Sequence, residues 1–379
     1  MKLRWPLRIH LASWLSCGWL LCGTVACLSS LPGVCYADAT SDQLDVLRSM
    51  QPGDEAAMKQ AASIAKTLRS NPDVTLVRVL SAMKGASPIG KNWLVGLANA
   101  IHSRSNVPTA QLESFLADTN QDSEARYTVF RWLTDGNAEL KAQWLDRMLD
   151  DPSLEIRFDA VARALNASDD LSKEALQKLL DAARHPEQIV AIVGRLDKLG
   201  VKIDQAKHFG FLTEWKLIGP FDNVGTKHFG TVYPVETDAL ANRVADAYLG
   251  KSGQVQWQSA KTDSPEGVLD VAKIYNNEKG CIVYGVTTVR VPKDLDCEIR
   301  VGSYNAQKVW VNGELVIAND VYHTGMQIEQ YTSPIRLRAG ENRIVIKLCQ
   351  NEQKEAWAQQ YVFQARLCDA TGKAITLAP

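Results

Sequence analysis

The sequence lacks both a charge imbalance and the short motifs that mark several functional classes. Its 42 Lys and Arg residues nearly balance its 43 Asp and Glu residues, so the net charge is −1. A nearly neutral chain has no electrostatic footprint for nucleic acid. The sequence also has no Gly-x-Ser-x-Gly or His-Glu-x-x-His motif and no Gly-rich phosphate loop. We therefore expect neither an enzyme nor a protein that needs a metal or a cofactor.

A calcium loop is also missing, although one acidic run imitates its beginning. Asp, Asn, Asp and Glu alternate over residues 118–124 like the first ligands of an EF-hand. An EF-hand needs Gly at its sixth position and Glu at its twelfth. Ser123 and Val129 occupy those positions here. We expect a solvated loop in which Asp122 or Ser123 caps the next helix.

Cysteine is absent between residues 40 and 280. Four of the eight cysteines precede residue 36, and the other four follow residue 280. In an oxidising compartment the latter four allow two disulfides with three connectivities. The alternative is four buried free thiols that pack as small apolar side chains. These candidate disulfide cysteines are Cys281, Cys297, Cys349 and Cys368.

The N-terminal segment is typical of a secretory signal peptide, which we assign to residues 1–39. Three basic residues precede an apolar stretch over Leu11–Val34, and Ala37–Ala39 provides a small-x-small cleavage pattern. The alternatives are an uncleaved membrane anchor and a lipid on Cys27. No later segment is apolar over enough residues to span a membrane. We predict an exported protein that is periplasmic, extracellular or associated with the cell envelope.

Residues 40–205 show apolar side chains at helical spacing. Helices are expected over Asn92–Ser103, Ser123–Leu133, Leu140–Met148 and Ile189–Leu199. Their short connections favour antiparallel neighbours, in a bundle or a short α-solenoid.

One further helix is expected to start at Asp151, as the N-cap, and Pro152. Its predicted apolar stripe consists of Leu154, Phe158, Val161 and Leu165. The segment Asp150–Val161 resembles the second half of a HEAT repeat, which implies a degenerate HEAT-like repeat region.

In residues 206–379, apolar and polar side chains alternate over short runs, and turn residues separate these runs. Asn312-Gly313 between two β-rich runs predicts a two-residue hairpin, because both turn positions need a positive φ. A second hairpin is expected over residues 335–348, with its turn at Ala339–Glu341. Strands that follow one another without helices imply an antiparallel β-sandwich. Further strands are expected over Ile282–Val291, Cys297–Gly302 and Tyr361–Cys368.

The segment Trp215–Asn223 resembles the first strand of galactose-binding-like jelly rolls in exported bacterial proteins. Gly302-Ser303, Val309–Gly313 and Lys347–Gln350 follow in the order of that family's motifs. The hairpin is also similar to the PA14 group of carbohydrate-binding barrels. That group has Asp-Asp-Gly where this chain has Tyr304-Asn305-Ala306, so the resemblance does not extend to its calcium site. A weak HEAT-like region before such a jelly roll resembles uncharacterised exported bacterial proteins.

The resemblance implies a carbohydrate-binding-like module, in which aromatic rings stack on sugars and polar side chains fix hydroxyl groups. We predict a non-catalytic exported binding or scaffold protein. A glycan or envelope polysaccharide would bind the sandwich, and a protein partner would bind the helical half. The alternative is a structural cell-envelope protein whose sandwich binds proteins, and a hydrolase is a third hypothesis. The ligand-binding candidates are Tyr304, Asn305, Tyr322, His323, Asn351 and Trp357.

Overall fold

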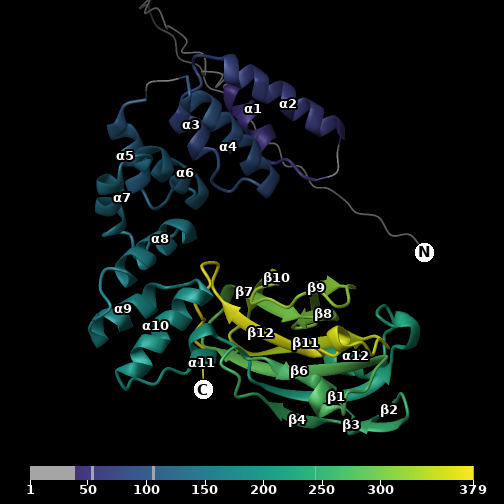
Figure 1. Ribbon diagram of the computed structural model, residues 1–379. Helices are drawn as coiled ribbons and strands as arrows, with labels where there is room; N and C mark the ends of the chain where they lie inside the picture. The colour runs from purple at the N-terminus through teal and green to yellow at the C-terminus, as the bar shows by residue number, and fades with distance from the viewer. Residues whose placement is uncertain (1–38, 53–54, 105–106, 244, 379) are drawn as a thin grey trace, which may run out of the picture.

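The computed structural model describes residues 39–52, 55–104, 107–243 and 245–378. Helices occupy the first half of these residues, and antiparallel sheets occupy the second half (Figure 1). The predicted α-plus-β organisation is therefore confirmed. The predicted signal peptide falls almost wholly outside the described residues, and Ala39 is the first residue of helix α1. Among the described residues, no helix has the length and apolar character needed to cross a membrane.

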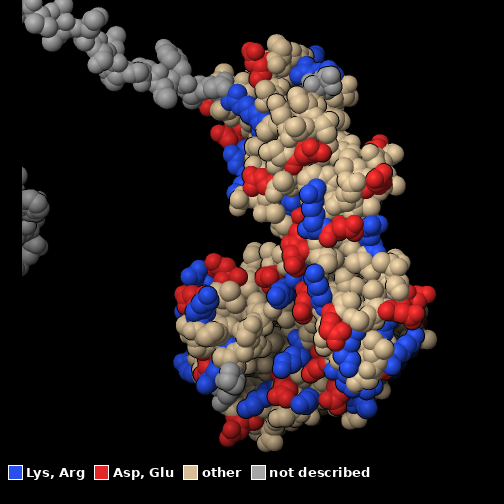
Figure 2. All heavy atoms as spheres, turned by 90° about the vertical axis from the view of Figure 1, so that its left-hand side faces the viewer, with Lys and Arg blue, Asp and Glu red and all other residues tan. Residues whose placement is uncertain are grey.

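The helices of the first half pack on their neighbours in chain order and form an arc that ends beside the sheets (Figure 1). Figure 2 shows acidic and basic side chains interspersed over the outer face of this arc. Two apolar clusters hold it together, one from α1 to α8 and one from α8 to the start of the β half. The helices are α1 (Ala39–Arg48), α2 (Glu55–Ser70), α3 (Leu76–Ser81), α4 (Pro88–His102), α5 (Thr109–Ala117), α6 (Ser123–Thr134), α7 (Ala138–Leu145), α8 (Leu154–Leu165), α9 (Lys173–Ala182), α10 (Pro186–Lys198) and α11 (Gln205–Phe209).

Helix α6 begins as its sequence predicts. The carboxylate of Asp122 accepts hydrogen bonds from the backbone N–H groups of Glu124 (3.1 Å) and Ala125 (3.2 Å). This satisfies two of the free donors at the start of the helix. The acidic run over residues 118–124 thus serves the turn before α6 and its N-cap.

The predicted start of helix α8 is wrong. Ser153 is the N-cap, and the carboxylate of Asp151 instead forms a buried ion pair with Arg126. The predicted apolar stripe is also wrong in part, because Leu154 and Phe158 are 40% and 38% exposed. The face that α8 buries is formed by Ile156, Arg157, Ala160 and Val161. Capping propensity alone did not reveal the partner of Asp151, which lies 25 residues earlier in the chain.

The β half contains two packed sheets and a small third one, and every strand pairing is antiparallel. The six-stranded sheet has the order β4-β1-β6-β11-β8-β9, the four-stranded sheet β10-β7-β12-β5, and the third sheet β2-β3. The strands are β1 (Glu214–Asp222), β2 (Ala247–Gly250), β3 (Gly253–Gln256), β4 (Gln258–Lys261), β5 (Leu269–Asp270), β6 (Cys281–Val291), β7 (Leu295–Ser303), β8 (Ala306–Val311), β9 (Glu314–Asn319), β10 (Tyr331–Leu337), β11 (Gly340–Gln350) and β12 (Val362–Cys368).

The first predicted hairpin is confirmed and the second is wrong. Asn312 and Gly313 have φ values of 52° and 86° and join β8 to its partner β9. By contrast, β10 pairs with β7, and β11 pairs with β6 and β8. The turn at Ala339 therefore carries the chain from one sheet to the other. Alternation predicts both strands, but it does not say which sheet each one joins.

The apolar core lies between the two main sheets and contains side chains from both. Trp215 lies in it, with its ring 5.0 Å from that of Phe363. All four cysteines of the β half are buried free thiols in the structure, so it contains no disulfide between them. Burial raises the pKa of Cys281 and of Cys349 to about 12, which leaves both protonated at neutral pH.

A second layer covers part of the outer face of the six-stranded sheet. It comprises the short helices η1 (Val224–Thr226) and α12 (Pro234–Leu240) together with β2 and β3. Apolar side chains of this layer pack on outward-facing residues of β1, β6 and β11. Beyond the edge of the layer, the outer face of the sheet stays accessible. Two short helices complete the fold, α13 (Val271–Ile274) and η2 (Ala356–Ala358).

The two halves of the chain meet where the segment after α11, residues 210–212, lies against strand β12. Backbone hydrogen bonds join Leu212 N–H to Ala365 O (2.8 Å) and Leu367 N–H to Gly210 O (3.0 Å). The Arg366 guanidinium, 1% exposed, donates to Phe209 O and forms an ion pair with Glu329 at 2.6 Å. These contacts fix the connecting segment to the four-stranded sheet.

His208 on α11 makes the junction between the halves sensitive to pH. Burial, followed by the nearby Arg184 guanidinium, lowers the pKa of His208 from its ordinary value of 6.5; Arg366 acts the same way, and Asp181 opposes them. A lowered folded-state pKa gives a stability contribution that is complete above the unfolded pKa and is lost as the pH falls through the folded pKa. We therefore expect the free energy of unfolding to decline more steeply in wild type than in His208→Gln below about pH 6.5. Urea unfolding at several pH values measures this, and equal slopes would contradict it.

Candidate functional site

Four of the six predicted ligand-binding residues come together at one end of the sandwich. We call Tyr322, His323, Asn351 and Trp357 the loop cluster. The Nε2 atom of His323 lies 2.9 Å from Oδ1 of Asn351. The rings of His323 and Trp357 meet edge to face, with 5.0 Å between their centroids. Trp357 is 60% exposed and is the accessible aromatic ring of the cluster.

Most polar groups of the predicted residues already hold the loops in place. Asn351 is 8% exposed, and its amide nitrogen donates to Gln353. The Tyr322 hydroxyl accepts a hydrogen bond from Asn223 at 3.1 Å. A sugar would have to displace these bonds, so the cluster offers little beyond the exposed indole of Trp357.

The remaining two predicted residues do not join the loop cluster as ligand groups. Asn305 is 2% exposed and donates from its amide nitrogen to Gln360 O at 2.7 Å. Tyr304 is partly buried, and its carbonyl accepts a hydrogen bond from Thr324 N–H. Both residues hold the ends of neighbouring loops together.

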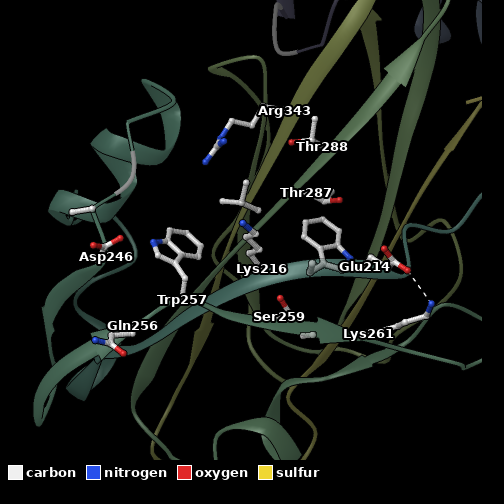
Figure 3. A pocket seen from close by; sticks show the side chains of 14 residues that line it. Glu214, Lys216, Asp246, Gln256, Trp257, Ser259, Lys261, Thr287, Thr288 and Arg343 are labelled. Carbon is white, nitrogen blue, oxygen red and sulfur yellow. Dashed lines mark hydrogen bonds and ion pairs between the residues drawn. The ribbon is translucent and has the colours of Figure 1, made fainter. Parts of the chain in front are cut away.

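A pocket that we did not predict lies on the outer face of the six-stranded sheet (Figure 3). Its volume is about 820 Å³, and we call it the sheet groove. Pairing between strands brings the floor together, because Ser259, Lys216 and Val286 are successive partners across β4, β1 and β6. Arg343 of β11 pairs with Thr288 of β6 and extends this surface. Side chains on one face of a sheet recur at every second residue, so Lys216 faces outward between the buried Trp215 and Leu217.

Aromatic and hydroxyl groups give the sheet groove the chemistry of a sugar site. Trp257 stands at its wall where the second layer ends, partly buried against that layer and with its ring toward the hollow (Figure 3). Thr288 and Ser259 add exposed hydroxyl groups from β6 and β4. An apolar ring beside a few fixed polar groups is the usual composition of a small-ligand pocket.

Two cations in the sheet groove have no carboxylate partner among the described residues. The ammonium of Lys216 takes part in no ion pair there. The Arg343 guanidinium donates from Nη1 to Asn242 Oδ1 at 2.7 Å, and its Nε has no partner within the described chain. Burial lowers the pKa of Arg343. In Figure 3 both side chains point toward the hollow beside Trp257. The groove therefore combines an indole with two cations that form no ion pair within the described chain.

Glu214 in the sheet groove does not suit the role of general acid in glycoside hydrolysis. Glu214 forms an ion pair with Lys261 at 2.8 Å, and the hydrogen bond from this lysine lowers its pKa. A general acid for glycoside hydrolysis needs a raised pKa. Asp246 lies at the opposite side of the groove from Glu214 (Figure 3). Among the described residues, no group of three or more His, Cys, Asp and Glu side chains is arranged to hold a metal ion.

One feature of the sheet groove, the orientation of Lys216, can be predicted from the sequence. The alternation of Trp215, Lys216 and Leu217 indicates that Lys216 faces away from the core. We identified the surrounding Trp215–Asn223 segment only by its resemblance to the first strand of a jelly roll, and Trp257 lay outside every strand that we expected. The register that brings Lys216, Trp257 and Arg343 to one face depends on pairing between distant segments.

No protein-family model and no curated protein matches the chain. A β-glucosidase from Kluyveromyces marxianus in complex with glucose is 16% identical, with a TM-score of 0.19, over 24% of this chain and 11% of that one. The selenomethionine-labelled β-glucosidase from the same organism is 13% identical, with a TM-score of 0.29, over 85% and 36%. A GH31 α-xylosidase from Xanthomonas citri is 11% identical, with a TM-score of 0.18, over 42% and 16%. The chain spans 36% or less of each, and likenesses this weak carry no argument about fold or activity.

Proposed function

We propose that this is a non-catalytic exported protein whose β half binds a carbohydrate in the sheet groove. The observation that carries the proposal is the open hollow of about 820 Å³ in which the Trp257 ring meets hydroxyl groups and two cations. In this proposal the β half is a jelly roll of the galactose-binding-like kind. The helical arc is a HEAT-like α-solenoid that offers its surface to a protein partner.

The proposal moves the expected ligand site from the loop cluster to the sheet groove. The groove is concave, and its polar side chains are free to meet a ligand, whereas the loop cluster uses most of its own to hold loops. Trp357 remains the alternative contact, because it is the most exposed tryptophan ring on the sandwich, at 60%. The two tryptophans thus allow a matched test of the two sites.

Replacing Trp257 should weaken glycan binding while replacing Trp357 should not. Loss of a central aromatic contact costs about 2 kcal/mol, which is more than tenfold in affinity. A glycan array of the purified protein, of Trp257→Ala and of Trp357→Ala measures this. Trp257→Phe keeps an aromatic ring in the wall and should retain part of the binding. If Trp357→Ala loses binding and Trp257→Ala keeps it, the loop cluster is the site. If no variant or wild type binds any glycan, the proposed function is wrong.

One observation favours a second function, a structural envelope protein that binds proteins. A pocket of about 490 Å³ lies between the helical arc and the sandwich, lined by α8 and α10 on one side and by Arg300 and Thr371 on the other. Leu154 and Phe158 are exposed there, and Phe158 meets His185 edge to face at 5.0 Å. Exposed apolar side chains of this kind suit a peptide partner. A blank glycan array with a folded protein would favour this function.

A further inference from the structure

We propose that the ligand of the sheet groove is an anionic polysaccharide, whose acid groups are bound by Lys216 and Arg343. This inference rests on the proposed carbohydrate binding and adds the chemical class of the sugar. Acid groups on a sugar chain are carboxylates or sulfate esters, and both accept hydrogen bonds from a guanidinium. The proposal therefore concerns the shared negative charge and leaves the two sources to separate arms of the test.

The first observation concerns the hydrogen-bond partners of Arg343. Its guanidinium is partly buried, its Nη1 bonds only the neutral Asn242, and its Nε has no partner within the described chain. Burying part of a charge without an opposite charge is unfavourable, and an anion that binds there relieves this. The fully buried Arg126 and Arg366 form ion pairs with Asp151 and Glu329. The partly buried Arg184 and Arg195 have no ion pair among the described residues, but each donates to three backbone carbonyls.

The second observation is the arrangement of charge around Trp257. Lys216 projects from β1, and Arg343 projects from β11, two strands away, toward the same hollow (Figure 3). The exposed pair Glu214–Lys261 neutralises itself at 2.8 Å. Asp246 has no ion pair among the described residues and lies on the Trp257 side of the groove, opposite Glu214 (Figure 3). A sugar ring against Trp257 would place a carboxylate or sulfate between the two cations.

The third observation concerns the length of the site. A second hollow of about 440 Å³ adjoins the sheet groove, and Thr288 and Arg343 line both. The second hollow reaches the hairpin turn at Gly313 and contains Arg338, which has no ion pair among the described residues. The floor from β4 to β11 spans three strand spacings, about 14 Å. This is longer than one sugar ring, so the groove has room for more than one residue of a polysaccharide chain.

Isothermal titration calorimetry on the full chain tests the inference with five polymers. Polygalacturonate and alginate carry carboxylates, dextran sulfate carries sulfate esters, dextran is neutral, and polyglutamate carries charge without sugar. We expect at least one acidic polysaccharide to bind at least about tenfold more tightly than dextran and polyglutamate. Binding should also weaken with added salt, because charged contacts at an exposed groove are screened.

The variants separate a specific site from general charge. Lys216→Gln and Arg343→Gln should each lower the affinity for the acidic polysaccharide about tenfold, as expected for loss of a charge-assisted contact. Arg343→Lys keeps the positive charge and should retain binding better than Arg343→Gln, which excludes a mere loss of folding. Lys293→Gln removes an exposed cation outside both hollows and should leave the affinity unchanged.

Three results would overturn the inference, and they differ in what they mean. If dextran binds as tightly as the acidic polymers and neither charge variant matters, carbohydrate binding stands and the acidic ligand is wrong. If polyglutamate binds as well as the polysaccharides, the groove recognises charge and not sugar. If no polysaccharide binds at all, the proposed function fails together with the inference.

Discussion

Arg126→Ala is expected to lower the free energy of unfolding of the helical half by about 3–5 kcal/mol, the usual cost of leaving one partner of a buried ion pair alone. Arg126 is 1% exposed, and its two Nη atoms each lie 2.6 Å from an oxygen of Asp151. The same guanidinium donates to Leu116 O from Nε and Nη2. It therefore joins the end of α5, helix α6 and the segment before α8. Urea unfolding followed by far-ultraviolet circular dichroism measures the loss.

Arg131→Ala is the matched control for Arg126→Ala. Arg131 lies on the same helix but is exposed, and its guanidinium lies 6.0 Å from the centre of the Tyr127 ring. Removing it should change the stability by less than about 1 kcal/mol. If Arg126→Ala lowered the free energy of unfolding by no more than Arg131→Ala does, the buried ion pair would not hold α6 to the segment before α8.

Lys347→Met is expected to lower the free energy of unfolding by about 3–5 kcal/mol, because it leaves the buried carboxylate of Glu236 without its positive partner. Lys347 on β11 is fully buried, and its Nζ donates to Phe229 O (3.0 Å) and Thr231 O (2.6 Å). It also lies 3.4 Å from the carboxylate of Glu236, which in turn accepts a hydrogen bond from Tyr284 at 2.7 Å. These contacts fasten the second layer to the sheet, and the same layer ends in the Trp257 wall of the groove. We therefore expect glycan binding to weaken together with stability.

Two further variants isolate the charge effect at Lys347. Lys308→Met removes the neighbouring lysine on β8, whose Nζ lies 4.7 Å from the centre of the Phe229 ring, and should cost about 1 kcal/mol or less. Adding Glu236→Gln to Lys347→Met removes the stranded charge and keeps the acceptor for Tyr284, so part of the stability should return. A double variant that is less stable than Lys347→Met alone would show that the carboxylate is not the source of the loss.

The elements that the sequence predicted correctly are those that depend on short-range chemistry. Asn312 and Gly313 adopt positive φ values in the turn between β8 and β9, and Asp122 caps α6 through its own neighbours. Alternation also located most strands of the β half to within a few residues. These features need information from only a few neighbouring residues.

The failed predictions each involve a partner that is distant in the sequence. Asp151 has good capping chemistry, but its ion pair with Arg126 places the cap at Ser153 instead. Strand β11 follows β10 after a short turn, yet it pairs with β6 and β8. Local propensity describes the strands and leaves their assignment to a sheet undetermined.

The candidate site was missed for the same reason. The loop residues that we predicted come together in part, but several of them hold loops and leave Trp357 as the exposed ring. The sheet groove consists of outward-facing side chains from β1, β4, β6 and β11, and the register between these strands brings them to one face. Only the outward position of Lys216 was visible in the sequence. Its convergence with Trp257 and Arg343 follows from tertiary structure.

Hydrogen–deuterium exchange with and without a bound polysaccharide tests most directly whether the sheet groove is the binding site, because it locates the ligand without any substitution. We expect slower exchange on binding in segments 214–218, 254–261 and 340–346, which form the sheet groove. The helical arc and the loop cluster should exchange at unchanged rates. Protection confined to residues 351–361 or to the helices would contradict the claim that the sheet groove is the binding site.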